Sequence, residues 1–239
     1  MANSYLSIYD QSRFLFDLPF IFRDAQHMGK VMDGPVGKES ADSLEKRVNV
    51  TIAAGGIYEG PRVTYNRARP INTPKDFQGL KIRVMENPIS VSTFKALGAN
   101  PVPMAYSELY LALQQGTIDG AENAQINILS AKHHEVAKFI SRTNHFNAPI
   151  HIIASTKWLS ALSADHRKAI MEAGREAALW ERTQWDEATK KAEDQLTAEG
   201  AKINSVDLAP FRDAVASVWA EYESKVGGKA AIRAILDTK

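Results

Sequence analysis

The 239-residue sequence contains no cysteine, and this absence removes several chemistries. Disulfide bonds, thiol catalysis, and zinc or iron–sulfur sites held by cysteine are all excluded. The compartment stays open, because a protein without cysteine can work under reducing or oxidising conditions. The sequence also has neither a Gly-x-Gly-x-x-Gly element nor a P-loop, which argues against dinucleotide or nucleotide chemistry.

An excess of charge of one sign is also missing. Lys and Arg number 29 against 28 Asp and Glu, so no long-range field favours nucleic acid or an anionic membrane as the partner. No apolar run approaches the roughly 20 residues that a membrane-spanning helix needs. Residues 1–10 have neither a basic n-region nor a continuous apolar h-region, so we expect no secretory signal peptide in this chain.

What the sequence does contain is typical of an α/β protein. Hydrophobic residues make up 44% of the chain, enough for one large core or two smaller ones. Short apolar runs alternate with helix-length segments and turn signals from residue 14 to about residue 149. Residues 48–54 are expected to form one strand. In a second strand, residues 80–84, alternation places Lys81 and Arg83 on the polar face.

Residues 163–200 predict an unusually long helix. This stretch has no proline, a single internal glycine at Gly174, and apolar residues at helical spacing. One helix, or two nearly collinear ones, would be on the order of 50 Å long at 1.5 Å per residue. That length exceeds the width of one small α/β lobe, so we expect the helix to lie across two lobes and tie them together.

A series of short segments in a fixed order carries a family resemblance. The segments are residues 17–22 (DLPFIF), 33–37 (DGPVG), 69–71 (RPI), 79–84 (GLKIRV), 97–104 (LGANPVPM) and 113–123 (LQQGTIDGAEN). In order and separation they resemble the DctP-type solute-binding proteins of tripartite ATP-independent periplasmic (TRAP) transporters. The resemblance covers nearly the whole chain, including the long helix.

The resemblance implies an α/β, type II periplasmic-binding-protein-like fold with two lobes, joined by hinge strands and a long bridging helix. Residues 1–60 and 149–188 are expected to form the first lobe, and residues 61–148 and 189–239 the second. Residues 1–4 resemble the end of the family's third strand. Two βα units, roughly 60 residues at about 30 per unit, and a signal peptide are then missing before them. We therefore expect an N-terminally truncated, incomplete first lobe.

The implied function is that of a periplasmic receptor. It would capture a small organic carboxylate and deliver it to the membrane permease subunits of an ion-driven TRAP transporter, with no catalysis, cofactor, metal or nucleic acid. Two alternatives stay open. The truncated chain could bind no solute and form a swapped or partner-completed assembly by self-association through the incomplete first lobe. An enzyme on a similar fold would need a nucleophile–base pair or a metal set that the sequence does not offer.

The same resemblance assigns the ligand-binding residues. Arg83 matches the arginine that clamps the ligand carboxylate, a bidentate task that suits a planar guanidinium. Asn123 matches an asparagine that holds the same carboxylate. Arg62 matches a second arginine of the cleft, with Arg67 and Arg69 as competitors. Four further residues occupy positions that line the cleft in relatives: Tyr106, Glu122, His145 and Asn147. Such a set favours a carboxylate with several hydroxyls, so a sugar acid is preferred over a C4-dicarboxylate.

Two other clusters of polar residues have simpler explanations. Asp119 and Glu122 could be taken as the paired carboxylates of a glycoside hydrolase, but turn capping and the binding of ligand hydroxyls both explain them without catalysis. The run His133-His134-Glu135 invites a metal site. Adjacent helical residues point about 100° apart, however, so they cannot chelate one ion from one face.

Overall fold

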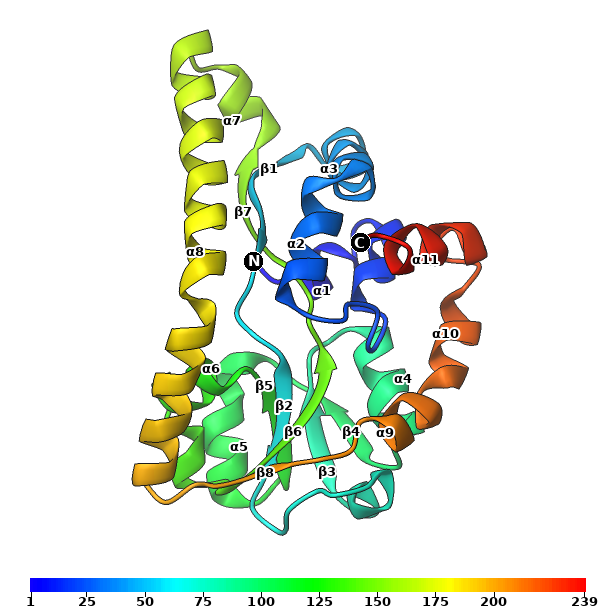
Figure 1. The fold of residues 1–239 in the computed structure, drawn as a ribbon, viewed down its shortest axis with the longest axis vertical. Helices are drawn as coiled ribbons and strands as arrows, with labels where there is room; N and C mark the ends of the chain where they lie inside the picture. Colours follow the sequence, from blue (N-terminus) through cyan, green and yellow to red (C-terminus); the bar gives the residue numbers. More distant parts are fainter.

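The computed structural model describes residues 1–239 as two parts stacked along the long axis of the molecule (Figure 1). The lower part is built on a six-stranded mixed sheet with the strand order β4-β3-β5-β2-β6-β8. Its strands are β2 (Arg62–Asn66), β3 (Lys81–Val84), β4 (Asn100–Pro103), β5 (Gly120–Asn123), β6 (Phe139–Phe146) and β8 (Lys202–Ser205). This sheet is the centre of the second lobe.

Strand direction brings several strand ends to one edge of this sheet. β3 runs parallel to β4 and β5, whereas β2 is antiparallel to both β5 and β6. The carboxyl ends of β3, β5 and β6 and the amino end of β2 therefore share an edge. In Figure 1 this edge faces the upper part of the molecule. Ligands of α/β proteins commonly bind outside the carboxyl ends of strands.

Helices cover both faces of the sheet. They are α4 (Pro88–Ala96), α5 (Leu109–Gln115) and α6 (Gln125–Ser130), with the 3-10 turns η2 (Pro74–Phe77), η3 (Tyr106–Glu108) and η4 (His133–Glu135). Gly116 ends α5 in the left-handed conformation, at φ 72°. A cluster of 12 buried residues, including Tyr65 of β2 and Leu113 of α5, fills one side of the sheet. These elements hold the strand ends at fixed positions.

The upper part, the first lobe, is mostly helical. It contains α1 (Asn3–Leu6), η1 (Gln11–Asp17), α2 (Ala25–Asp33), α3 (Pro35–Val48), β1 (Val50–Ile57), β7 (Ile150–Ser155) and α7 (Thr156–Ser160). β1 and β7 form a two-stranded antiparallel sheet, and an isolated bridge joins Ala2 to Ile150. The strand expected at residues 48–54 is confirmed, shifted by about two residues. Self-association through this lobe stays a prediction.

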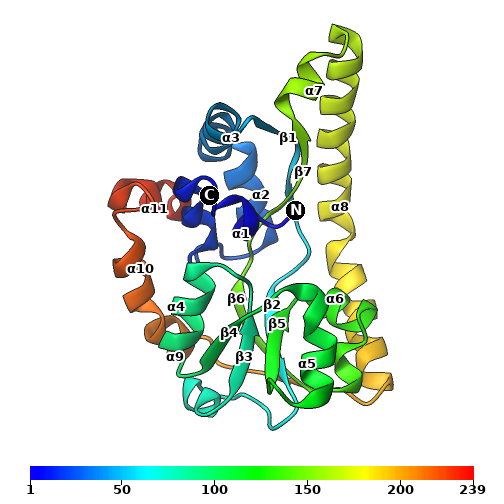
Figure 2. The ribbon, with the colours of Figure 1, turned by 180° about the vertical axis from the view of Figure 1, so that it is seen from behind.

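The long helix α8 (Ala164–Ala198) is one continuous element of 35 residues. Ser163 caps it by accepting a hydrogen bond from the backbone N–H of His166. The helix runs along both lobes (Figures 1 and 2) and packs on β1 in the first and on α6 in the second. The expectation of a bridging helix is confirmed. None of the helices combines the length and apolar character that crossing a membrane requires.

The C-terminal segment returns from the second lobe to the first. α9 (Ala209–Ala214) and α10 (Ala216–Tyr222) follow the second lobe, where α10 packs on α4. α11 (Gly228–Leu236) then lies near α2, with His27 hydrogen-bonded to the carbonyl of Ile235 at 2.9 Å. The division into lobes stays a proposal. One observation bears on the assignment of residues 189–239 to the second lobe: α11 contacts α2 of the first lobe through Ile235 and His27.

A large apolar cluster of 28 buried residues extends through both lobes. It includes Phe14 and Phe22 of the first lobe and Phe77 and Phe94 of the second. Trp185, from the middle of α8, belongs to the same cluster. The lobes are therefore packed against each other through this cluster.

Candidate ligand-binding site between the lobes

A cavity of about 370 Å³ lies between the two lobes, at the sheet edge where the strand ends meet. This volume is within the usual range of small-molecule sites, about 300–1,000 Å³. Its lining combines mainly apolar residues of the first lobe with mainly polar residues of the second. The lining residues are Met1, Ala2, Tyr5, Glu59, Arg62, Arg83, Met85, Tyr106, Asn123, Asn127 and Ile150. Four of the seven predicted ligand residues are among them.

Arg83 lines the cavity near the carboxyl end of β3, with 1% of its surface exposed. Nε and one terminal nitrogen donate hydrogen bonds of 2.9 and 2.6 Å to the carbonyl of Met104. The guanidinium carbon lies 5.9 Å from the ring centre of Tyr106. Because a guanidinium has five N–H groups and two are engaged, three remain available to an anion. No carboxylate of the protein forms an ion pair with Arg83.

Arg62, at the amino end of β2, is already neutralised by the protein. It donates to both side-chain oxygens of Glu122, and its second terminal nitrogen donates to Glu59 at 2.7 Å. A further bond of 3.2 Å reaches the backbone carbonyl of Glu122. Four of its five N–H groups are engaged, which leaves one for a ligand. The two arginines thus differ: Arg62 is a fixed part of the wall, whereas Arg83 keeps N–H groups free to receive an anion.

Glu122, in β5, is fully buried behind Arg62. Burial by itself would raise the pKa of this carboxyl, but the adjacent Arg62 and a hydrogen bond with His145 lower it to about 2. His145 is also fully buried, and burial lowers the pKa of its imidazole against the opposing effect of Glu122. Glu122 is therefore a stable anion that orients Arg62. Nε2 of His145 lies 3.4 Å from a side-chain oxygen of Glu122.

Asn123 lines the cavity at the carboxyl end of β5. Its side-chain oxygen accepts hydrogen bonds from the backbone N–H of Ala124 at 2.9 Å and from Nδ2 of Asn127 at 3.0 Å. Since the oxygen is occupied, the group that Asn123 can offer is its Nδ2 donor. A donor beside Arg83 suits a carboxylate oxygen.

Glu59 and Asn127 are polar residues of the cavity wall that the sequence did not predict. Glu59 accepts hydrogen bonds from Arg62 and, at 2.9 Å, from Nδ2 of Asn127. It stands in the short linker between β1 and β2, where no periodic pattern marks a charged side chain as facing inwards. Asn127 follows Asn123 by four residues. That spacing at the start of α6 was a signal that could have found it.

Tyr106 and His133 form the aromatic side of the site. The hydroxyl of Tyr65 is 2.8 Å from Nδ1 of His133, and the two rings stack at 5.6 Å. Tyr106 packs edge-on against the same imidazole at 5.7 Å. Burial, followed by the charge of Arg83, lowers the pKa of His133 to about 4, so the imidazole is neutral at neutral pH. The adjacent His134 pairs instead with Glu199 at 2.6 Å, so the two imidazoles have separate partners.

Three predicted or competing residues lie away from the cavity. The amide of Asn147 is occupied in the hinge, where its oxygen accepts from Tyr58 and its Nδ2 donates to the carbonyl of Phe22. Arg69 donates to the carbonyls of Asp76 and Gln78 at the opposite end of β2. Arg67 is the residue directly after β2, at that same end. Of the three arginines considered for the second position, only Arg62 lines the cavity.

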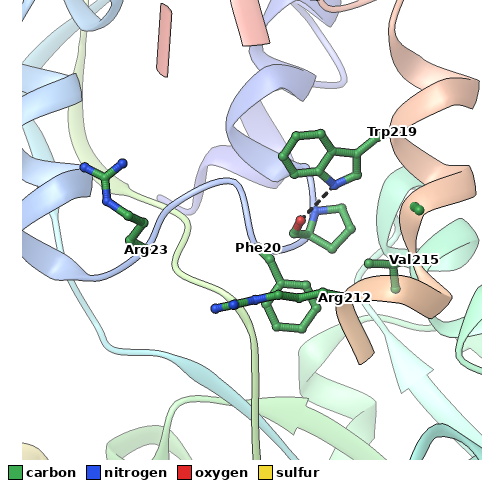
Figure 3. A pocket seen from close by; sticks show the side chains of 7 residues that line it. Phe20, Arg23, Arg212, Val215 and Trp219 are labelled. Atoms are coloured by element: carbon green, nitrogen blue, oxygen red, sulfur yellow. Dashed lines mark hydrogen bonds between the residues drawn. The ribbon is translucent and has the colours of Figure 1, made fainter. Parts of the chain in front are cut away.

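A second cavity, of about 460 Å³, shares no lining residue with the first. It lies between the loop after η1 and the helices α9 and α10 (Figure 3). The indole N–H of Trp219 donates to the carbonyl of Pro19 at 2.9 Å, and the guanidinium of Arg212 lies 5.6 Å from the ring centre of Phe20. Apolar rings and partly engaged arginines at an open surface do not form a converging set of polar groups. This cavity belongs to the packing between the lobes.

Comparisons with known proteins agree with this arrangement. The chain is 37% identical to a solute-binding protein of Chromohalobacter salexigens over 221 residues, which are 89% of this chain and 65% of the relative. It is 36% identical over 203 residues to the 2,3-diketo-L-gulonate-binding periplasmic protein YiaO of Escherichia coli K12, covering 84% of this chain and 61% of the relative. The chain thus spans less than two thirds of the length of these two relatives.

A solved structure confirms the expected fold. The crystal structure of a TRAP periplasmic solute-binding protein from Roseobacter denitrificans, with bound β-D-glucuronate, matches with a TM-score of 0.94 at 34% identity. The match covers 100% of this chain and 79% of that one. Residues 1–225 match the family described as "Bacterial extracellular solute-binding protein, family 7". The chain belongs to this DctP family of solute-binding proteins.

Proposed function

We propose that the protein is the periplasmic solute receptor of a TRAP transporter, which binds a small organic carboxylate between its lobes. The solute would be a sugar acid in preference to a C4-dicarboxylate, and the receptor would deliver it to ion-driven membrane permease subunits. The observation that carries the proposal is Arg83, a buried arginine in the inter-lobe cavity with three N–H groups free and no carboxylate partner.

The rest of the cavity fits this solute class. Asn123 offers a neutral donor beside Arg83, while Glu59 offers acceptor oxygens to hydroxyl groups. The names of two similar proteins point the same way: the E. coli relative is described as binding a diketogulonate, and the R. denitrificans structure holds a glucuronate. Contacts to both lobes would favour the closed state, so binding and closure are coupled.

Titration calorimetry with D-glucuronate and with succinate tests the proposal. Arg83→Ala should weaken glucuronate binding about 100-fold or more, because charge-assisted bonds are worth about 1.5–3 kcal/mol each. Arg83→Lys should recover only part of the affinity, since an ammonium cannot form a planar fork. Asn123→Ala should cost about 1–2 kcal/mol, the value of one amide contact.

Lys81→Ala is the matched control, because Lys81 lies on the same strand with an exposed side chain and outside the cavity. This variant should bind like the wild type. Wild-type affinity in Arg83→Ala would remove Arg83 from the site, and tighter binding of succinate than of glucuronate would overturn the preference for a sugar acid.

A further inference from the structure

The side-chain charges at the cavity are balanced, and Glu59 is the group that completes the balance. Two arginines, Arg62 and Arg83, face two carboxylates, Glu59 and Glu122. His133 and His145 are buried imidazoles and add no charge at neutral pH. These side chains together with a ligand of one carboxylate therefore carry one net negative charge, and with a dicarboxylate they carry two. Met1 also lines the cavity, and its α-amino group donates to the carbonyl of His151 at 2.6 Å.

The two carboxylates of the wall differ in their access to a ligand. Glu122 is fully buried, and both of its oxygens are bound to Arg62. Glu59 keeps 24% of its side chain exposed and lines the cavity. Arg62 and Asn127 use two of its acceptor positions, one on each oxygen. A carboxylate has about four such positions, so about two remain unused.

We propose that Glu59 is a specificity-determining residue, which makes the cavity select acids with one carboxylate and several hydroxyls over acids with two carboxylates. Its free acceptor positions bind ligand hydroxyl groups. Its charge repels a second carboxylate, and no arginine of the wall is left without a carboxylate partner once Arg83 holds the first. This inference deepens the proposed function and rests on it, since it assumes that organic acids bind in this cavity.

A matched pair of ligands isolates the effect. D-gluconate and D-glucarate are linear acids with the same hydroxylated chain, and they differ only at the last carbon, which is a hydroxymethyl group in one and a carboxylate in the other. We expect the wild-type protein to bind gluconate at least about tenfold more tightly than glucarate. In Glu59→Gln, which keeps the shape but not the charge, the ratio of the two dissociation constants should fall by about tenfold.

Two further variants separate charge from general damage to the fold. Glu59→Asp keeps the charge and should retain the preference for gluconate. Glu181→Gln removes a nearby carboxylate that accepts from the backbone N–H of Tyr58 and contacts neither arginine of the wall. It should leave the ratio unchanged. Each result is the ratio of the gluconate and glucarate dissociation constants of one variant. A smaller fraction of folded protein changes both constants equally and does not alter their ratio.

The outcomes distinguish the two proposals. If the wild type binds gluconate or glucuronate but Glu59→Gln leaves the ratio unaltered, the role of Glu59 is wrong while the proposed function stands. A wild-type preference for glucarate would likewise overturn the role of Glu59. If calorimetry finds no binding of glucuronate, gluconate or glucarate at millimolar concentration, the proposed function itself fails, and the inference fails with it.

Discussion

The hydroxyl of Tyr58 donates a hydrogen bond of 2.5 Å to the side-chain oxygen of Asn147. Tyr58 lies in the linker from β1 to β2 and Asn147 in the linker from β6 to β7, so this bond joins the two strand connections between the lobes. Both side chains are buried, and Nδ2 of Asn147 donates a second hydrogen bond to the carbonyl of Phe22. The hinge is thus a hydrogen-bonded unit and not two independent linkers.

Tyr58→Phe should lower the free energy of unfolding by about 1–2 kcal/mol, because it leaves the buried oxygen of Asn147 without this donor. Urea denaturation measures the change. Tyr9→Phe is the control, since Tyr9 is 70% exposed. Equal stability of Tyr58→Phe and wild type would show that the bond does not hold the hinge.

Gly60→Ala should destabilise the protein by about 3 kcal/mol. Gly60 has φ +103°, and a Cβ there would overlap the indole ring of Trp185. The unfavourable backbone conformation costs about 1–2 kcal/mol and the overpacking about 1–3 kcal/mol. Gly79→Ala separates the two causes, because Gly79 also has a positive φ, +80°, but no atom within 4 Å of the added carbon. If both variants lose the same stability, packing against Trp185 is not the cause.

The pH dependence of stability should contain a contribution from Glu122. Burial alone would raise the pKa of this carboxyl, but Arg62 lowers it from its ordinary 4.5 to about 2, so the folded state favours the ionised form. This contribution is complete above pH about 4.5 and is lost as the pH falls towards 2. Glu122→Gln should therefore be less stable than wild type at pH 7, with a difference that shrinks between pH 4.5 and pH 2.

Urea denaturation at pH 7, 5 and 3 measures this difference. Glu108→Gln provides the matched control, because Glu108 is exposed and forms no ion pair. A difference between Glu122→Gln and wild type that stays constant from pH 7 to pH 3 would contradict the assignment.

Trp219→Phe should cost about 1 kcal/mol, the typical value of one hydrogen bond. The indole N–H of Trp219 ties α10 to the loop after η1 through the carbonyl of Pro19 (Figure 3). Trp180→Phe should have almost no effect, because Trp180 is 65% exposed on α8. Thermal unfolding of the two variants compares them directly, and a larger loss in Trp180→Phe would reverse this ranking.

Local patterns predicted the parts of the site that stand on regular elements. The alternation in β3 placed Arg83 on the polar face of a strand, and the uninterrupted helical spacing of residues 163–200 predicted α8. The sequence alone could not predict that Arg83 is the arginine whose N–H groups stay free. That role depends on which arginine is already paired with Glu122, and such a pairing depends on the register of β2 with β5 and not on either strand alone.

Linker residues were the least predictable. Glu59 faces the cavity and Asn147 does not, although both lie between a first-lobe strand and a second-lobe strand. The direction of Asn147 is fixed by its contact with Tyr58, 89 residues away, and that of Glu59 by contacts with Arg62 and with Asn127, which is 68 residues away. Contacts between segments that are distant in sequence also determine the position of α11 beside α2. Its carbonyl groups accept hydrogen bonds from Arg23 and His27.

The unequal walls of the inter-lobe cavity have a kinetic consequence. Both arginines and both asparagines stand on the second lobe, whereas the first lobe contributes a mainly apolar wall that includes Tyr5 and Ile150. An acid that enters the open cleft then meets its charged partners before the lobes close. On the proposed function, we expect the second lobe to set the association rate constant and the first-lobe wall to set the lifetime of the closed complex. Ile150→Ala should raise the dissociation rate constant in stopped-flow measurements and leave association unchanged.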